Sequence, residues 1–485
     1  MRASQPPPTP ACAALLERLR QTLPAETLLT APEELRPYEC DGLTTQTQLP
    51  QLVLLPNAVD QVRTIMTHCH ECQVPVVVRG AGTSLVGGAQ PVAGGVVLSL
   101  ARLNRIIEID PDNRYARVQP GVRNHAINRA AQEFDLFYAP DPTSLVACTI
   151  GGNIAANAGG VHAMKYGNTA AHLLEAKLVT AEGELVTLGH LANDLLGYDL
   201  LSLLAGSEGL LGVVIEATVQ LLPRPASKAL VLANFASLEA SGQAAAQLLT
   251  TGISLAALEI LDEQVIDSLA DSPASAYLSR PAAILIGEID GSAAEVERLG
   301  AQVRQVLNQA GAARLQTLTD RHAIDTVWSG RRAAFVALGK LAPNQAFLDG
   351  TVPPPQLAKV MRRIQELAAS QQLPLAMLSH AGAGILYPIV LYDANQPAQT
   401  AAVAWLQARV MELYLTVGGS IASECGIGTH KLVPMCQQFR IPELTQLHRI
   451  KTALDRDSLL NPGKGVPDPQ HCAELGSSLT LPTPH

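Results

Sequence analysis

The sequence predicts an α+β fold built from two successive domains. Short strands separated by glycine and proline, with few long helices, fill the chain up to about Pro225. Beyond Ser227, longer helical stretches alternate with strands. The 485 residues are 47% hydrophobic, which is enough for two or three domains with real cores.

The first half opens with a strand–helix–strand pattern. Residues 52–56 form a short apolar run, Ala58–Cys72 has helical periodicity, and Val76–Val78 is β-branched and apolar, as in a buried strand. A further helix is expected at residues 124–134. The other strands are expected at residues 96–100, 105–109, 115–119, 176–180, 184–188 and 213–222.

The second half reads as layers of helix and sheet. We expect helices at residues 237–250, 293–310, 355–371 and 396–416, and strands at residues 229–235, 282–290, 376–384 and 389–393. The tail after Asp468 is polar and is expected to be loosely ordered. The expected divisions are a helical N-terminal lead (1–46), a first domain (47–226), a second domain (227–467) and the tail (468–485).

The composition excludes several classes of function. The net charge is −9 and no run of Lys and Arg occurs, so nucleic acid is not an expected partner. There is no uninterrupted apolar stretch of about 18 residues, and the first 30 residues do not resemble a secretory signal. The eight cysteines are irregularly spaced, which favours a reduced, cytoplasmic setting, with peripheral membrane association as the alternative.

One cysteine pair, Cys69 and Cys72, has the C-x-x-C spacing of redox and metal sites. It lies on the amphipathic helical pattern that contains Val62, Ile65 and Met66, and no second C-x-x-C completes a zinc site. We therefore expect these cysteines to pack within a helix.

A glycine-rich loop, Arg79–Gly88, follows the buried strand. Loops without side chains let backbone N–H groups surround a phosphate. The loop lacks the Gly-Lys-Ser/Thr of a Walker motif and the G-x-G-x-x-G of a Rossmann fingerprint, so by itself it fits a phosphate site and a structural hairpin equally well. Two further small-residue stretches, Ala139–Gly160 and Gly206–Pro223, leave room for a flat ligand and favour the first reading.

From about Leu35 to Gly476 the chain resembles a known flavoprotein family. The matching motifs are ARVQPGVRN, YAPDP, GGNIAANAGGVH, KYG, GSEGLLG and LLNPGK. They are similar to those of the D subunit of glycolate oxidase and the D-lactate and D-2-hydroxyglutarate dehydrogenases, in the vanillyl-alcohol oxidase/PCMH-type superfamily. The resemblance implies a PCMH-type FAD-binding domain followed by an α+β cap, the FAD-linked oxidase C-terminal domain.

The resemblance also implies a set of FAD-binding residues. The backbone of Arg79–Gly88 would hold the pyrophosphate, and Asn461 would close on the flavin from the C-terminus. Residues 142–144, 148–153 and 157–161 would line the ribityl chain and ring, and residues 209–214 would flank the adenine. The full set is Arg79, Gly80, Ala81, Gly82, Thr83, Ser84, Gly87, Gly88, Pro142, Thr143, Ser144, Cys148, Thr149, Gly151, Gly152, Asn153, Asn157, Gly159, Gly160, Val161, Glu208, Gly209, Gly212, Val213, Val214 and Asn461.

The mode of FAD binding is expected to be non-covalent. Covalent members of the superfamily carry a His just after the R-G-x-G of the loop. Here Thr83 takes that place, and the loop contains no His or Cys.

For the reaction centre, the resemblance implies an arginine that clamps the substrate carboxylate. It also implies a divalent metal held by two His and one Glu, and a further His that acts as base. The arginine matches Arg331 in VWSGRRAAF, with the neighbouring Arg332 as a rival. A guanidinium suits two-pronged carboxylate binding.

The metal and base motifs depart from the family pattern. H-x-G-D-G-N-x-H-P keeps His380, but its Asp, Asn and second His are replaced by Ala383, Ile385 and Tyr387. G-E-H-G-I-G-R-E-K keeps Glu424, but the base His is replaced by Cys425.

These replacements put the divalent metal in doubt. His380 and Glu424 are the two remaining metal ligands, one fewer than catalytic zinc usually has; Tyr387 or Cys425 would have to supply a third. Without a metal, His380 could itself act as base. The alternative is an altered or decayed site in which His380 and Glu424 form a hydrogen-bonded pair, and the loss of polar groups favours this reading over an intact site.

Three functions stay open at this point. The first is oxidation of a small 2-hydroxy acid, such as glycolate or D-lactate, with electrons passed to a quinone or another carrier. The second is a flavin-binding, non-catalytic subunit of a glycolate oxidase-like complex; the third is a flavoenzyme with an altered substrate. No iron–sulfur spacing occurs, so electrons must leave to a partner or a diffusible acceptor, and partner subunits or a homodimer are expected.

Overall fold

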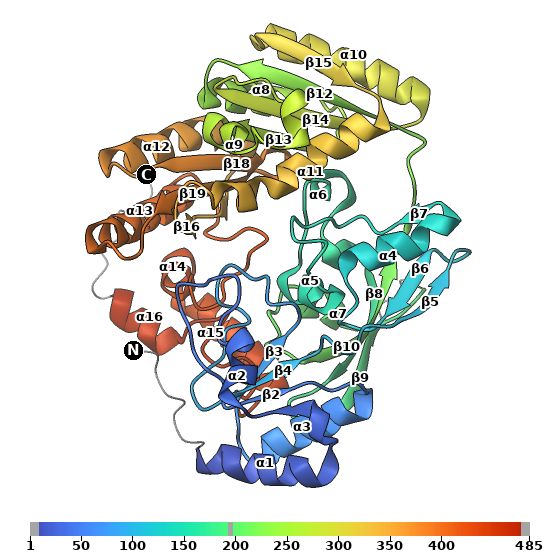
Figure 1. Ribbon diagram of the computed structural model, residues 1–485, viewed down its shortest axis with the longest axis vertical. Helices are drawn as coiled ribbons and strands as arrows, with labels where there is room; N and C mark the ends of the chain where they lie inside the picture. Colours follow the sequence, from blue (N-terminus) through green and yellow to red (C-terminus); the bar gives the residue numbers. More distant parts are fainter. Residues whose placement is uncertain (1–8, 193–196, 477–485) are drawn as a thin grey trace. The chain divides into compact units, whose positions relative to one another are not determined.

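The computed structural model describes residues 9–192 and 197–476, and the chain in it divides into two compact units (Figure 1). Among the described residues, unit 1 comprises 9–159, 167–192, 197–223 and 424–476, and unit 2 comprises 160–166 and 224–423. The N-terminal lead before Thr9 and the tail after Gly476, both named in the sequence analysis, lie outside the described residues.

Unit 1 begins with a four-stranded sheet in the order β1-β2-β4-β3. Its strands are β1 (Leu28–Leu29), β2 (Leu52–Leu54), β3 (Val76–Arg79) and β4 (Val96–Ser99). Helices α1 (Pro10–Thr22) and α3 (Val59–Glu71) share one apolar core with this sheet, and Cys69 is completely buried in that core. The helical interpretation of the C-x-x-C segment is therefore confirmed.

A second sheet of unit 1 has the order β5-β6-β10-β8-β9. Its strands are β5 (Ile106–Asp110), β6 (Tyr115–Val118), β8 (Leu173–Val179), β9 (Leu185–Gly189) and β10 (Val213–Gln220). Helices α4 (Asn124–Ala131), α5 (Ile150–Ala156) and α7 (Leu200–Leu204) contribute to its core. A short pair joins β7 (Leu136–Phe137) to β11 (Leu222–Pro223).

The C-terminal segment of the chain completes unit 1. Leu460 forms a parallel bridge with Val76, and the backbone amide of Val76 donates to Leu459 at 2.8 Å, so the chain end lies beside β3. Helices α14 (Leu432–Gln438), α15 (Ile441–Leu454) and α16 (Pro469–Gly476) belong to this segment. In Figure 1 they are the red helices next to the blue N-terminal elements.

Unit 2 is built on one large antiparallel sheet with the order β15-β12-β14-β13-β18-β19-β16, in which β17 also pairs with β19. The strands are β12 (Ser227–Phe235), β13 (Ala257–Asp262), β14 (Ala283–Gly291), β15 (Arg314–Leu318), β16 (Asn344–Phe347), β17 (Gly350–Thr351), β18 (Leu375–His380) and β19 (Ile385–Tyr392). Helices α8 (Leu238–Leu249), α10 (Ala293–Gln309) and α12 (Leu357–Ser370) pack on the sheet and on one another.

Helix α11 (Arg321–Leu338) lies where the acidic side chains of β13 and β14 project. Glu259 of β13 contacts Arg331, and Glu288 of β14 contacts Trp328. The α13 helix (Pro397–Thr416) packs on β17 and β19. Neither α11 nor β13 was expected from the sequence, although α11 carries Arg331 and β13 carries Glu259.

Two sequence expectations differ from the structure. The segment after Asp468 was expected to be loose, but Pro469–Gly476 is helical and its Cys472 is buried. The cysteines were expected to be reduced, but Cys436 and Cys472 form a disulfide with a Cα–Cα distance of 5.2 Å. The two are 36 residues apart, and the packing of α14 on α16 brings them together, which spacing alone does not reveal.

The compact units are also divided differently from the expected domains 47–226 and 227–467. Residues 424–467 join unit 1, because their backbone and side chains bond to β3 and to the glycine loop after it. Residues 160–166 join unit 2, because His162, Lys165 and Tyr166 bond to β14.

Candidate functional site

The glycine loop after β3 offers a row of backbone donors. Among the residues that the structure describes, the amides of residues 80–84 have no hydrogen-bond acceptor. Gly82 and Gly87 have φ values of 71° and 80°, a region that favours glycine. Successive N–H groups left unpaired at the end of a strand suit an anion such as a pyrophosphate.

Arg79 holds this loop in shape. Its guanidinium is buried and donates to the carbonyls of Cys40 at 2.7 Å and Ala89 at 3.4 Å, and it faces the ring of Tyr38 at 5.6 Å. Burial lowers the pKa of Arg79 from its ordinary value, although nearby Asp41 opposes the shift. Arg79 therefore acts on the loop backbone, which the motif alone did not indicate.

The second glycine stretch meets the loop at Gly80. A Cβ on Gly80 would collide with the hydroxyl of Thr149, the residue just before α5. The Thr149 hydroxyl is buried and has no hydrogen-bond partner among the described residues. A close glycine contact beside an unsatisfied buried hydroxyl fits a site whose ligand supplies the missing partner.

The rest of this stretch is held by buried amides. Asn153 is buried in α5, and its side-chain oxygen accepts from Asn124 at 3.2 Å and from the thiol of Cys148 at 3.7 Å. Gly151 lies against Pro120, where a Cβ would approach the proline ring within 2.8 Å. Asn157 ends α5 with φ 47° and accepts from the amide of Ala170 at 2.9 Å.

The C-terminal segment braces the loop from the other side. The half-buried Glu208 carboxylate accepts from the amides of Ile427 and Gly428, both at 2.7 Å. Asn461 donates to the carbonyl of Glu208 at 2.6 Å and accepts from the amide of Val78 at 3.2 Å. Burial raises the pKa of Glu208, although the two amide bonds oppose the shift. Asn461 and Glu208 thus fix the end of β3.

Lys464 is a residue whose role the sequence analysis missed. Its ammonium group is buried and donates to the carbonyls of Gly88, at 3.0 Å, and Gln90. Burial lowers its pKa to about 8, while nearby Asp41 and Glu208 oppose the shift. Lys464 belongs to the quoted LLNPGK motif, but nothing in the motif shows that it ties down the far end of the glycine loop.

Unit 2 brings together two of the predicted catalytic residues, Arg331 and His380. Both contact Glu259, which is completely buried. The Glu259 carboxylate accepts from Arg331 Nε at 2.9 Å and lies 2.6 Å from His380 Nδ1. An ionised carboxylate only accepts hydrogen bonds, so His380 donates from Nδ1 and its Nε2 is the nitrogen that can accept a proton.

The local structure explains this cluster. Glu259 and His380 are directly opposite each other in the β13–β18 ladder, so their side chains lie on the same face of the sheet. Arg331 occupies the buried stripe of α11 that also contains Val327 and Trp328. Arg331 Nη1 is buried and has no hydrogen-bond partner among the described residues, which suits an incoming carboxylate.

Tyr387 lies in the same cluster. Its ring meets the His380 ring edge-on at 5.2 Å and the Phe335 ring at 6.0 Å. The Arg331 guanidinium lies over Phe335 at 5.7 Å. Tyr387, which replaces the second His of the family motif, thus places an aromatic ring beside His380. Ile385, opposite His380 in the β18–β19 ladder, is also apolar and buried.

The side chains of unit 2 do not fit a divalent metal. Ala383, Ile385 and Tyr387 offer no nitrogen ligand, so His380 is the one residue of this motif that keeps a ring nitrogen. No group of three or more His, Cys, Asp or Glu is arranged to hold a metal ion in the part of the chain that the structure describes. Glu424 and Cys425 open the last segment of unit 1, so the pairing of Glu424 with His380 stays a prediction.

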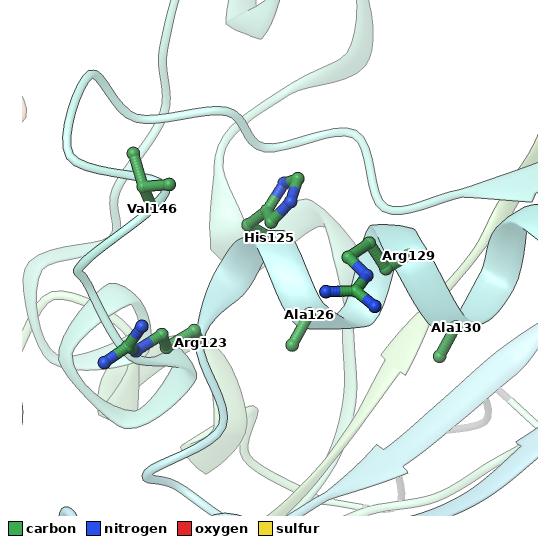
Figure 2. Close-up of a pocket in the computed structure, with 6 residues that line it drawn as sticks. All are labelled: Arg123, His125, Ala126, Arg129, Ala130 and Val146. Carbon is green, nitrogen blue, oxygen red and sulfur yellow. The ribbon is translucent and has the colours of Figure 1, made fainter.

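A surface cavity of about 430 Å³ lies over α4 in unit 1 (Figure 2). It is lined by Arg123, His125, Ala126, Arg129, Ala130 and Val146. None of these is a predicted site residue, and the two arginines and Val146 are exposed to solvent.

Comparisons with known proteins agree with this picture. A model described as "FAD binding domain" matches residues 50–189, and one described as "FAD linked oxidases, C-terminal domain" matches residues 224–465. Among solved structures, p-cresol methylhydroxylase with substrate bound has a TM-score of 0.81 at 18% identity, covering 95% of this chain and 98% of that one. The predicted α+β fold, a PCMH-type FAD-binding domain followed by an FAD-linked oxidase C-terminal domain, is confirmed.

Curated relatives match over nearly the whole chain. The glycolate oxidase subunit GlcD of Escherichia coli K12 is 44% identical over 96% of this chain and 93% of the relative. GlcD of Bacillus subtilis is 35% identical, covering 88% and 91%, and D-2-hydroxyglutarate dehydrogenase of Xanthomonas citri pv. viticola is 31% identical, covering 92% and 95%.

No helix in the described part of the chain is long and apolar enough to cross a membrane. The cytoplasmic setting, with peripheral membrane association as its alternative, stays a prediction. By the extent and identity of these matches, the chain belongs to the FAD-linked oxidases, in the group that contains the GlcD subunits of glycolate oxidase.

Proposed function

We propose that this FAD-dependent 2-hydroxy acid oxidoreductase oxidises a small substrate of the glycolate or D-lactate type, with Arg331 and His380 as its catalytic residues. The observation that carries the proposal is the buried cluster in which Glu259 joins both side chains. The GlcD and D-lactate dehydrogenase names of the relatives support this substrate class.

Arg331 is proposed to bind the substrate carboxylate. Its Nη1 has no partner among the described residues, and Glu259 fixes the guanidinium through Nε and Nη2, each 2.9 Å from the carboxylate. The side chain is thus oriented before substrate arrives, which favours a fixed substrate geometry.

His380 is proposed to take the proton of the 2-hydroxyl group. Glu259 accepts a hydrogen bond from Nδ1–H of His380, so Nε2 is the nitrogen that would take the proton. The Glu259 carboxylate would then stabilise the imidazolium that forms. FAD, when bound, supplies the two-electron acceptor for the hydrogen on the α-carbon. No step of this proposal needs a metal ion.

FAD itself is proposed to bind non-covalently in unit 1. The unpaired amides of residues 80–84 and the unsatisfied Thr149 hydroxyl support the pyrophosphate position, and Thr83 replaces the His of covalent members. Denaturation in acid followed by centrifugation tests the binding mode. The yellow colour is expected in the supernatant, and a yellow pellet would overturn non-covalent binding.

The electrons are proposed to leave to a quinone or another carrier through partner subunits or a homodimer. The relatives from Escherichia coli and Bacillus subtilis are named as glycolate oxidase subunits, which supports an assembly. Co-purification of the tagged chain from its source, followed by mass spectrometry, tests this. Recovery of a monomer alone at physiological concentration would contradict it.

Anaerobic mixing of the FAD-loaded protein with glycolate, D-lactate and D-2-hydroxyglutarate tests the main proposal. Bleaching of the oxidised flavin band by at least one of them is expected. If none bleaches a fully loaded flavin, the proposal fails and a non-catalytic or altered-substrate role takes its place.

That second candidate rests on one observation: Tyr387 and Ile385 make the surroundings of His380 more apolar than the family motif does. The double variant Tyr387→His/Cys425→His, assayed with and without added zinc, discriminates the two. Metal-dependent gain of turnover in an otherwise inactive protein would favour a decayed site.

A further inference from the structure

A short segment that follows the second glycine stretch is built into unit 2. Residues 160–166, the crossing segment, belong to unit 2, whereas the chain on both sides of it belongs to unit 1. Gly160 and the following Gly167 have φ values of 137° and 83°, so glycine is favoured at both crossings. Within the segment, the amides of Lys165 and Tyr166 both donate to the carbonyl of His162 at 3.1 Å.

Glu288 of β14 is the first anchor of the crossing segment. Its carboxylate is completely buried and lies 3.1 Å from His162 Nε2. It also accepts from Lys228 at 2.8 Å and from the indole of Trp328 at 2.5 Å. Loss of any of these donors would leave the negative charge of Glu288 less well paired in the interior, which is costly. The Glu288 carboxylate therefore holds its partners firmly in place.

Asp290, two residues along the same face of β14, is the second anchor. It accepts from the hydroxyl of Tyr166 at 2.5 Å and forms an ion pair with Lys165. The Asp290 carboxylate has no exposed surface. The two anchors therefore hold both the start and the end of α6 (Ala163–Tyr166), the one-turn helix of the segment.

The crossing segment also touches both elements that carry the proposed catalytic residues. The His162 ring lies 5.8 Å from the ring of Trp328, which precedes Arg331 by one turn of α11. The side chain of Met164 packs on Gly382, two residues after His380, so closely that a Cβ there would collide with it. Movement of the segment would therefore disturb the backbone next to Arg331 and next to His380.

We propose that Glu288 and Asp290 are positioning residues: they fix the crossing segment, which continues the second glycine stretch, against the substrate-binding cluster of unit 2. The inference rests on the proposed function for its kinetic consequence, but the anchoring itself does not. Arg331 and His380 set where the substrate lies, and Asn157–Gly160 leads from the expected flavin region into the segment. Because the segment contacts α11 next to Arg331 and the chain just after His380, the rate of a reaction that needs a fixed substrate orientation is sensitive to these anchors.

The test uses the full-length, FAD-loaded protein and the variants Glu288→Gln and Asp290→Asn. Asp262→Asn is the matched control, because Asp262 is also a buried carboxylate of the same sheet but bonds to Val265 and Met377 rather than to the crossing segment. Backbone hydrogen exchange is followed for the peptide that covers residues 158–168, with peptides of β18 as internal references.

Both anchor variants are expected to lose protection in residues 160–166 by about tenfold or more, with smaller changes in the reference peptides. Asp262→Asn is expected to change the reference peptides instead. Unchanged exchange of residues 160–166 in both anchor variants would overturn the anchoring, whatever substrate the protein uses.

The kinetic arm measures flavin reduction under anaerobic conditions with whichever 2-hydroxy acid bleaches the wild-type flavin. The anchor variants are expected to reduce the limiting rate about tenfold or more, with substrate affinity changed less than threefold. The limiting rate is compared between anchor variants and Asp262→Asn that have lost the same thermal stability. If the rate of the anchor variants falls no more than that of Asp262→Asn, the role is purely structural and the proposal is overturned. If no 2-hydroxy acid reduces the wild-type flavin, the proposed function fails while the exchange arm still decides the anchoring.

Lys165 offers a conservative pair for the same question. Lys165→Met removes the cation that pairs with Asp290, whereas Lys165→Arg keeps it. Loss of protection in the first variant and its recovery in the second is expected. Equal loss in both would contradict a role for the ion pair.

Discussion

The two units build their sites from different material. In unit 1 the glycine loop presents backbone amides, and the side chains around it, Arg79, Glu208 and Lys464, bond mainly to other backbone groups. In unit 2 the site is made of side chains, with Glu259 joining Arg331 to His380. A backbone site tolerates changes of side chain as long as its glycines stay. A side-chain site changes its chemistry when one residue changes.

This contrast explains why the glycine motifs of unit 1 are intact while the side-chain motifs are altered, both in unit 2 and at Cys425 of unit 1. The FAD motifs keep their glycines, whereas Ala383, Ile385 and Tyr387 have replaced polar family residues in the metal motif. The glycines retained in the FAD motifs of unit 1 therefore say little about the reaction at the side chains of unit 2.

Arg331→Ala should separate the two sites most clearly. It removes the proposed carboxylate clamp, so flavin reduction by a 2-hydroxy acid should fall by about 10³-fold, while FAD content should be unchanged. Stopped-flow reduction at saturating substrate measures this, with Arg332→Ala as the matched control. Comparable losses in the two variants would mean that the wrong arginine has been assigned.

Glu288→Gln should destabilise the protein by about 3 kcal/mol at pH 7, because it removes a carboxylate whose pKa is strongly shifted. Burial alone would raise the pKa of Glu288, but His162 and Lys228 outweigh burial and lower it from 4.5 to about 2. Its stabilisation is therefore complete above about pH 4.5 and is lost as the pH falls toward 2. Thermal melts of both proteins at pH 7, 5, 4 and 3 should show the gap in Tm narrowing only below pH 4.5. A gap that does not depend on pH would contradict the charge-based explanation.

Cys436→Ser should lower the free energy of unfolding by about 2 kcal/mol, because it opens the link between α14 and α16. The disulfide lies in unit 1, so the rate of flavin reduction should not change. Melts with and without dithiothreitol give the comparison: the reductant should shift the wild-type Tm and leave the variant unaffected. If reductant shifts neither protein, the bond is not formed in solution.

Gly80→Ala should weaken FAD binding by about tenfold, because the new Cβ would collide with the Thr149 hydroxyl. Fluorescence titration of the apoprotein with FAD measures the affinity. Gly300→Ala in α10 is the control, since a Cβ there has its nearest neighbour at 3.5 Å and alanine favours the helix. Unchanged affinity in Gly80→Ala would show that the loop contacts the cofactor less closely than proposed.

The sequence predicted the parts of the molecule that depend on local patterns. Most strands and helices were identified, because alternation and helical periodicity are properties of neighbouring residues. The glycine stretches were found for the same reason. Arg331 and His380 were identified by resemblance, and their common contact supports a shared role without testing it.

The missed features are contacts between distant parts of the chain. Glu259 is 121 residues from His380, and only the pairing of β13 with β18 makes them neighbours. Lys464 is 376 residues from Gly88. A charged residue inside the apolar run ALEILD, and an arginine on the apolar stripe of α11, were signals that could have been read as buried ion-pair partners.

The discontinuity of unit 1 has a consequence for how the protein is made. The loop after β3 is synthesised well before Asn461 and Lys464, which secure it: Asn461 is 383 residues beyond Val78, and Lys464 is 376 residues beyond Gly88. A nascent or truncated chain that ends after residue 226 lacks the partners of both Val78 and Gly88. Cofactor loading is therefore expected to follow the synthesis of residues 461–464, and the first domain expressed alone should not retain flavin.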